Sequence, residues 1–253
     1  MTKYLSLIAV GMLLATTAEA QNPGFMGADQ HNNWSLSVYM WGAGMKGTVG
    51  LGPLDVPVDA SFSDILDNLE FAAFGHVEYN AENNFGVFGD VMFIGLGSNV
   101  TTESGNGSAS VDMDMWVVEG AVSYNLGSRE TPFNLFAGLR YWDVEMSTVI
   151  RTVVPETEIR PSGGADWTDF MVGARWAPRL GEKWWALLRA DIAFGDSDTY
   201  NLSGALVWRF ARSASMPFGY RYMALDYDKG TDLERRALDI DMSGPFLAIE
   251  FSF

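Results

Sequence analysis

The stretches FGVFGDVMF, residues 85–93, and WVVEGAVSY, residues 116–124, decide the fold. In each of them every second residue lies on one apolar face that begins and ends with an aromatic side chain. The opposite face carries the charges, Asp90 in the first stretch and Glu119 in the second. A period of two residues is the pattern of a β-strand with two different faces. Both stretches are therefore expected to form strands that separate an apolar environment from a polar one.

The same alternation recurs along most of the chain, where the expected strands are 34–46, 70–80, 84–97, 110–125, 132–148, 166–177, 183–194, 199–211, 217–227 and 237–253. Short polar turns follow every second strand. Longer polar stretches follow the first, third, fifth and ninth strands, at residues 47–69, 101–108, 151–165 and 229–236. Only the connection after the seventh strand, at 195–198, is shorter than this rule predicts. The sequence therefore predicts an all-β fold, a transmembrane, antiparallel, up-and-down β-barrel of about ten strands, with counts from roughly eight to twelve left open.

Alternation alone leaves open which face points inward, because a soluble barrel would bury its apolar face. The apolar face is bracketed by aromatic pairs eight residues apart: Phe85 and Phe93, Trp116 and Tyr124, Phe133 and Tyr141, Tyr200 and Trp208. Eight residues of a tilted strand rise ~20 Å, close to the ~25 Å apolar band between the aromatic girdles of outer-membrane barrels. We therefore expect the apolar face to point toward lipid, the charged face toward the lumen, and the protein to lie in the cell outer membrane.

The composition excludes several other classes of protein. The 253 residues carry a formal net charge of −16 and contain no cysteine. An acidic chain lacks the clustered Lys and Arg that nucleic-acid binding needs, so no nucleic-acid partner is expected. The absence of cysteine excludes disulfides and thiolate metal sites. We expect neither a cofactor nor a metal.

The beginning of the chain has the layout of a secretory signal peptide. Lys3 is followed by an apolar run from Tyr4 to Leu14, and residues 18–20 form a cleavage motif of the A-x-A type. The run is too short to span a bilayer. We expect residues 1–20 to be a signal peptide and residues 21–253 to form the outer-membrane β-barrel domain, with a flexible leader at 22–33.

The C-terminal stretch FLAIEFSF, residues 246–253, has one continuous apolar face, formed by Leu247, Ile249, Phe251 and Phe253. In this it resembles Gram-negative outer-membrane barrels, whose last strand typically ends in Phe. The chain is also similar to a group of small, mostly uncharacterised, porin-like proteobacterial outer-membrane barrel proteins at residues 41–50, 58–69, 219–228 and 243–246. The resemblance implies outer-membrane lipid as a partner, and recognition by the barrel-assembly machinery through the strand that ends in Phe253. It implies no particular activity.

The inward face collects charges of both signs, and these are the candidate functional residues. They form an expected lumen charge network of Glu78, Asp90, Glu119, Arg140, Asp169, Arg175, Arg189, Asp191, Arg209, Arg221 and Glu250. Most of the acids precede the arginines, so closure of the barrel should bring opposite charges together across the periplasmic half and the midplane. Paired Arg and carboxylate groups would plug a narrow lumen, whereas a gap between them would filter small solutes by charge. A barrel of about ten strands lies near the filled end of the size range, which favours the plug.

The first long connection contains a helix signal. Residues 63–69, SDILDNL, predict a short helix that Ser63 caps and that places Ile65, Leu66 and Leu69 on one side. Such a helix would fold onto or into the mouth of the barrel. The acidic residues around it do not have the spacing of an EF-hand calcium loop, so we interpret the connection as a solvated acidic loop.

Catalysis is not expected. The chain has two histidines, of which His31 precedes the first strand and His76 shares the inward face of the second strand with Glu78. No nucleophile accompanies His76 in a recognisable context, so no catalytic or metal-binding residue is assigned. Two functions remain: a narrow porin-like channel for ions or very small solutes, and a non-conducting structural or surface-interaction barrel of the cell envelope. A lipid-modifying enzyme that uses His76 ranks third.

Overall fold

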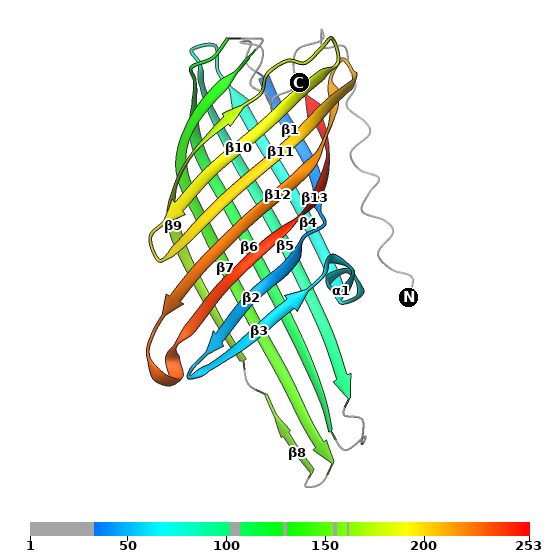
Figure 1. Cartoon of the computed structure of the whole chain (residues 1–253), viewed down its shortest axis with the longest axis vertical. Helices are drawn as coiled ribbons and strands as arrows, with labels where there is room; N and C mark the ends of the chain where they lie inside the picture. The colour runs from blue at the N-terminus through cyan, green and yellow to red at the C-terminus, as the bar shows by residue number, and fades with distance from the viewer. Residues whose placement is uncertain (1–32, 102–106, 129–130, 154–155, 161) are drawn as a thin grey trace.

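The chain forms a closed antiparallel barrel, which Figure 1 shows from the side as a computed structural model. The structure describes residues 33–253 apart from 102–106, 129–130, 154–155 and 161. The predicted signal peptide and leader residues 22–32 lie outside the described residues, and so does His31. No helix in the described part is long and apolar enough to cross a membrane.

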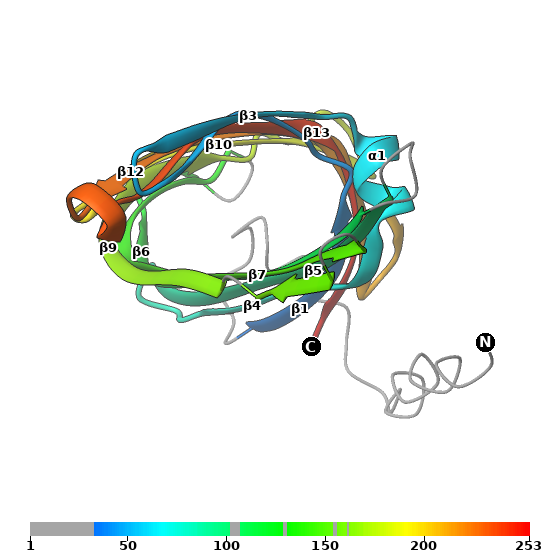
Figure 2. The ribbon, with the colours of Figure 1, turned by 90° about the horizontal axis from the view of Figure 1, so that it is seen from below.

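Ten strands make up the wall, as the alternation predicts. In order around the ring they are β1 (Asn33–Trp41) continued by β2 (Gly44–Leu51), β4 (Leu69–Asn80), β5 (Phe85–Thr101), β6 (Gly107–Asn125), β7 (Phe133–Val153), β9 (Ser162–Trp176), β10 (Trp184–Phe194), β11 (Ser197–Ala211), β12 (Ala214–Lys229) and β13 (Arg236–Ser252). β13 closes the barrel because it pairs with β1 from Ser252 to Phe246 and with β2 from Ser243 to Arg236. Figure 2 shows the resulting ring end-on.

Two of the expected polar loops contain more structure than predicted. In the stretch 47–69, β2 continues to Leu51 and turns into β3 (Leu54–Ala60), which pairs with it. Gly52 adopts a positive φ of 59° in this turn, directly before Pro53, and Val49 in β2 and Val56 and Val58 in β3 favour strand conformation. In the stretch 151–165, the short strand β8 (Glu156–Ile159) pairs with an extended β7. The interpretation of the stretch 47–69 as a solvated acidic loop gave too much weight to its acidic residues and too little to its strand signals.

The predicted helix is present, but its boundaries differ. α1 spans Phe62–Asp67, and Ser61 caps it rather than Ser63. The Ser61 Oγ accepts from the Asp64 amide at 3.3 Å, while the Asp64 carboxylate accepts from the Ser61 amide at 2.9 Å. The Ser61 hydroxyl also donates to the Asp64 carboxylate at 2.6 Å, and this bond, together with that from the Ser61 amide, stabilises the charged form and holds the pKa of Asp64 below its usual value. Leu69 belongs to β4 and not to the helix.

The two faces of the wall have the predicted orientation. On β5, Val87 and Val91 are exposed on the outside, whereas Phe88 and Met92 are buried in the lumen. Aromatic side chains pair across strands at two levels of the outer surface. Phe85 and Tyr124 form such a pair near one end, and Phe93 and Trp116 form one near the other, with ring centroids 4.9 and 4.5 Å apart. An apolar belt between aromatic girdles is what a lipid bilayer requires.

The connections identify the two ends of the barrel. The links from β4 to β5, β6 to β7, β9 to β10 and β11 to β12 all lie at the end that carries the C-terminus, at the top of Figure 1, which we assign to the periplasm. At the opposite, external end β5, β6 and β7 extend farthest, together with β8. The wall is much lower at β10 and β11, because a short turn at Gly195 and Asp196 joins these strands. The short connection noted at 195–198 is thus the turn at the lowest part of the external rim.

The apolar belt generates the first prediction. Leu188 is 45% exposed and lies on β10 between the levels of the girdles. Leu188→Arg should lower the free energy of unfolding by about 2–4 kcal/mol, because a guanidinium at that depth loses its hydration. Leu126→Arg, in the exposed periplasmic link after β6, is the matched control and should have little effect. Urea unfolding in lipid vesicles, followed by tryptophan fluorescence, measures both, and equal effects would contradict the assigned membrane belt.

Candidate functional site: the charged lumen

The strand register aligns much of the inward polar face in one row. From β13 through β1 to β9, consecutive strands place the following residues opposite one another: Glu250, Ser37, His76, Asp90, Glu119, Arg140 and Asp169. Residues paired across antiparallel strands point to the same side of the sheet, so all of these side chains enter the lumen. Of the eleven charged residues assigned to the lumen, ten are buried and Arg209 is half-buried.

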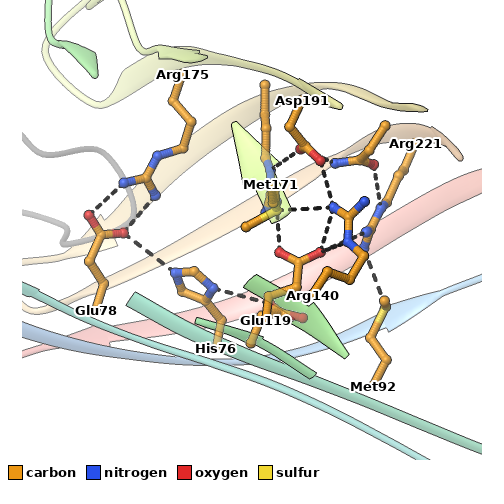
Figure 3. Close-up of polar contacts among 12 residues, drawn as sticks. His76, Glu78, Met92, Glu119, Arg140, Met171, Arg175, Asp191 and Arg221 are labelled. Carbon is orange, nitrogen blue, oxygen red and sulfur yellow. Dashed lines mark hydrogen bonds and ion pairs between the residues drawn. The ribbon is translucent and has the colours of Figure 1, made fainter. Parts of the chain in front are cut away.

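The centre of the lumen holds two carboxylates and two guanidinium groups, which we call the central cluster: Glu119, Arg140, Arg189 and Asp191 (Figure 3). Glu119 accepts from Arg140 Nε at 2.9 Å and from Arg189 Nη2 at 2.7 Å. Asp191 accepts from Arg140 Nη2 at 2.5 Å and from Arg189 Nε at 2.8 Å. Each acid therefore contacts both arginines, which offsets part of the large cost of removing four charges from water.

The central cluster reaches the opposite wall. Arg221 on β12 lies 4.0 Å from the Glu119 carboxylate on β6, and β6 and β12 lie on opposite sides of the ring. Arg221 Nε also donates to Asn201 Oδ1 at 2.9 Å, and Asn201 Nδ2 donates to Asp191 at 2.6 Å. Side chains from both halves of the wall thus meet in the middle of the lumen.

A second branch runs from β1 to β9. The Glu78 carboxylate forms a two-pronged ion pair with Arg175, with contacts of 2.7 and 2.8 Å. His76 lies between two acids, with Nδ1 3.1 Å from Asp90 and Nε2 3.4 Å from Glu78. The Tyr39 hydroxyl donates to Asp90 at 2.7 Å. This branch lies beside the central cluster, as Figure 3 shows for His76 and Glu119.

Aromatic rings and a thioether occupy the space between the charges. The guanidinium of Arg189 lies 5.7 Å from the ring centroid of Phe88 and 5.2 Å from that of Phe136, and that of Arg175 lies 5.0 Å from Phe88. Arg140 Nη2 contacts the Met171 sulfur at 3.3 Å. Guanidinium groups stack favourably on aromatic faces when they are desolvated. The lumen at this level is therefore packed with side chains.

Three of the predicted residues lie apart from these branches. Asp169 binds the β10–β11 turn, where its carboxylate accepts from the amides of Asp196 and Ser197 at 2.9 and 3.0 Å. Glu250 accepts from the hydroxyls of Ser37 and Ser215 at 3.3 and 3.2 Å. Arg209 lies nearer the periplasmic end, with its guanidinium 4.4 Å from the ring centroid of Trp185. The structure therefore brings eight of the eleven residues together, and it adds Tyr39, His76 and Asn201 to them.

The external half of the lumen differs from the prediction of a polar interior. On the external side of Glu119, β6 places Met113, Met115 and Val117 inside, and beyond Arg140, β7 places Trp142 and Val144 inside. The other strands contribute further apolar side chains to the same cluster, among them Met223, Leu225, Ile240 and Met242. The lumen thus has a charged part toward the periplasm and an apolar part toward the exterior. The sequence analysis considered the charges and overlooked this second pattern.

The described residues offer little that resembles a reaction centre. His76 is 2% exposed and is held by two carboxylates, so it has no open side for a substrate. No group of three or more His, Asp and Glu residues in the described ranges has the arrangement needed to hold a metal ion. The charged part of the lumen joins strands to one another through ion pairs and hydrogen bonds.

Comparisons with known proteins agree with the fold. No protein-family model matches the chain, and no curated protein matches its sequence. Among solved structures, the outer-membrane protease OmpT from Escherichia coli superposes with a TM-score of 0.55 at 9% identity, over 88% of this chain and 97% of that chain. Ail, the attachment invasion locus protein of Yersinia pestis, gives a TM-score of 0.39 at 13% identity, over 88% of this chain and 100% of that chain.

The similarity to the OmpT structure concerns the fold, because so low an identity transfers no site and no activity. Taken with the apolar outer belt and the charged interior, it identifies the chain as a closed antiparallel barrel of the cell outer membrane.

Proposed function

We propose that this chain is a non-conducting barrel of the outer membrane, without catalytic activity, that has a structural or surface-interaction role. The observation that carries the proposal is the central cluster, which links the wall at β6 to the opposite wall at β12 through Arg221. A porin-like channel needs a continuous file of water through this level. Side chains that contact one another across the lumen at this level support the absence of such a file.

The dimensions of the remaining space support this proposal. Arg140 and Glu119 are 0% and 2% exposed, so water scarcely reaches the centre of the lumen. A cavity beside the cluster, lined by Tyr39, Trp41 and Arg221 among others, measures about 50 Å³. One water molecule needs ~10–15 Å³ of such space, so the cavity has room for a few waters but not for a hydrated ion. A narrow porin-like channel for ions or very small solutes is the competing function.

The external end is where we place the function. Beyond the external girdle the outward face of the wall changes from apolar to acidic, with Asp112 and Asp114 on β6 and Glu145 on β7 exposed. An acidic surface cannot lie in hydrocarbon, so this part projects into solution. It offers a surface for partners outside the cell.

At the other end, the exposed Phe251 and Phe253 remain accessible next to β1. This supports the proposed recognition of the last strand by the barrel-assembly machinery.

Conductance in planar lipid bilayers tests the proposal. The folded protein should give no single-channel steps, since the central cluster closes the lumen. The double variant Glu119→Ala with Arg189→Ala removes one acid and one base from the cluster and should produce discrete steps. The matched control is Glu158→Ala with Arg151→Ala, which removes a 2.8 Å ion pair from the exposed external sheet and should stay silent. Regular steps from the unmodified protein would refute the proposal in favour of a narrow channel.

The cluster also predicts a change in stability. Glu119→Gln leaves Arg140 and Arg189 buried with only Asp191 as an acidic partner, and should lower the free energy of unfolding by about 3–5 kcal/mol. Glu158→Gln, in the exposed pair with Arg151, should leave it nearly unchanged because solvent screens that pair. Urea unfolding in vesicles provides the measurement. An unchanged midpoint for Glu119→Gln would mean that water hydrates the cluster, as it would in an open pore.

A further inference from the structure

The apolar part of the lumen contains a cavity that no interaction described so far explains. It measures about 260 Å³, and Met113, Met115, Val144, Met146 and Ile240 are among its lining residues; we call it the external chamber. Asp64 of α1 and Asn68, the C-cap of that helix, are the polar residues of its lining. Toward the periplasm, the buried side chains of Val117 on β6 and Trp142 on β7 separate it from the central cluster.

The lining determines what can occupy the external chamber. Water needs two to four polar partners, and these walls offer almost none, so the space is unfavourable for water. An apolar cavity of ~150 Å³ is enough to bind benzene in a protein interior. The external chamber is larger than that and has room for a longer hydrocarbon. Its methionines are flexible and polarisable, which suits ligands of variable shape.

The wall beside the external chamber is split. β1 and β4 pair only as far as Val38 and Gly75, and β4 continues outward to Leu69 without β1 beside it. On the other side of this split, β1 ends just before Gly42, and β2 begins at Gly44. The Gly42 carbonyl oxygen packs so closely against Gly244 that a side chain at position 244 would collide with that oxygen. β3 has one strand partner, β2, in the described part of the chain. We call this split between β1–β3 and β4 the seam.

α1 fills the outer part of the seam, beside β3 on the rim (Figure 2). Its Ile65 lines the external chamber, while Phe62 and Leu66 are 42% and 52% exposed. The helix therefore presents apolar groups both to the chamber and to the surroundings of the barrel. Its six residues form few contacts with the rest of the wall, so its displacement disrupts little of the sheet.

The exposed mouth of the seam lies at membrane depth. Phe71 on β4 is 60% exposed and packs against Phe93 of the external girdle, with ring centroids 5.8 Å apart. Met40, near the end of β1, is 70% exposed on the other edge of the seam. Phe71 and Met40 thus place an apolar side chain on each edge of the mouth, and Phe71 lies at the level of the external girdle, where the outer-leaflet hydrocarbon begins.

We propose that the external chamber binds one uncharged hydrocarbon chain, which it receives sideways from the outer leaflet through the seam under α1. This hydrocarbon chain can be the acyl chain of a membrane lipid or a small hydrocarbon dissolved in the bilayer, since both have the same chemistry. Binding of this kind goes beyond the non-conducting role proposed above. It does not depend on the central cluster, whose residues do not line the chamber.

Methionine methyl groups offer a direct test because they lie inside and outside the chamber. The protein, labelled with methyl-¹³C methionine, is placed in lipid nanodiscs and titrated with n-decane. The Met113, Met115 and Met146 signals should shift and reach saturation. Met171, buried in the central cluster, should stay unchanged, and lipid-facing Met40 should report only the decane dissolved in the bilayer. Equal responses of all these methionines, or none from the chamber methionines, would overturn the proposal.

A second experiment distinguishes a lipid acyl chain from a free hydrocarbon as the occupant of the external chamber. Phosphatidylcholine with a nitroxide near the end of one acyl chain replaces part of the lipid, without decane. Broadening of Met113 and Met115 together with Met40 identifies a lipid chain in the chamber. Broadening of Met40 alone, with a saturable response to decane, identifies a free hydrocarbon. Conductance is measured separately, so a failure of this proposal is distinct from a failure of the non-conducting role.

Variants that fill the chamber provide the control. Val144→Phe occupies the chamber and should abolish the saturable shift, whereas Val118→Phe, on the lipid-facing side of β6, should leave it intact. If Val144→Phe does not fold, as judged by heat-modifiable migration on gels, Ala60→Phe places the bulk at the edge near α1 instead. A decane response that survives a folded chamber-filling variant would place the binding elsewhere and overturn the proposal.

Discussion

The ion pairs among Glu119, Arg140, Arg189 and Asp191 are the interaction on which the rest of this barrel depends. A ring of about ten strands is too narrow for a wide aqueous channel, so charges that point inward meet one another rather than bulk water. An unpaired charge would be very costly to bury in this lumen. The arginines and the acids must therefore project from strands that bring them within contact distance of one another. The wall strands must then keep one register, because a displaced strand would separate its charge from the partners.

The same constraint divides the lumen into two parts. Where charges meet, aromatic rings such as Phe88 and Phe136 fill the remaining space and exclude water. Toward the exterior the inward positions are apolar, and packing there leaves an unfilled chamber next to a split wall. One barrel thus combines a closed inner half, which accounts for the proposed lack of conductance, with an outer half suited to hydrocarbon. On several strands the two halves meet at adjacent inward positions, as at Glu119 and Val117 on β6.

Most of the wall could be predicted from the sequence, because period two and paired aromatics such as Phe85 and Phe93 report directly on faces and membrane depth. The inward charges followed from the same alternation. The seam could not be predicted, since it depends on where β1 ends its pairing with β4, and pairing between distant segments has no local signal. The apolar outer lumen did have a signal. Met113, Met115 and Val117 precede Glu119 at alternate positions, and Trp142 and Val144 follow Arg140 in the antiparallel neighbour.

The row of inward residues from Glu250 to Asp169 also limits how the length of this chain can change during evolution. Inserting one residue in the middle of β6 would reverse the faces of half the strand and turn buried groups out toward lipid. Inserting two would restore the faces but shift Glu119 one pleat away from both of its arginines. Insertions and deletions are therefore tolerable beyond the external girdle, where β5, β6 and β7 already exceed their neighbours in height.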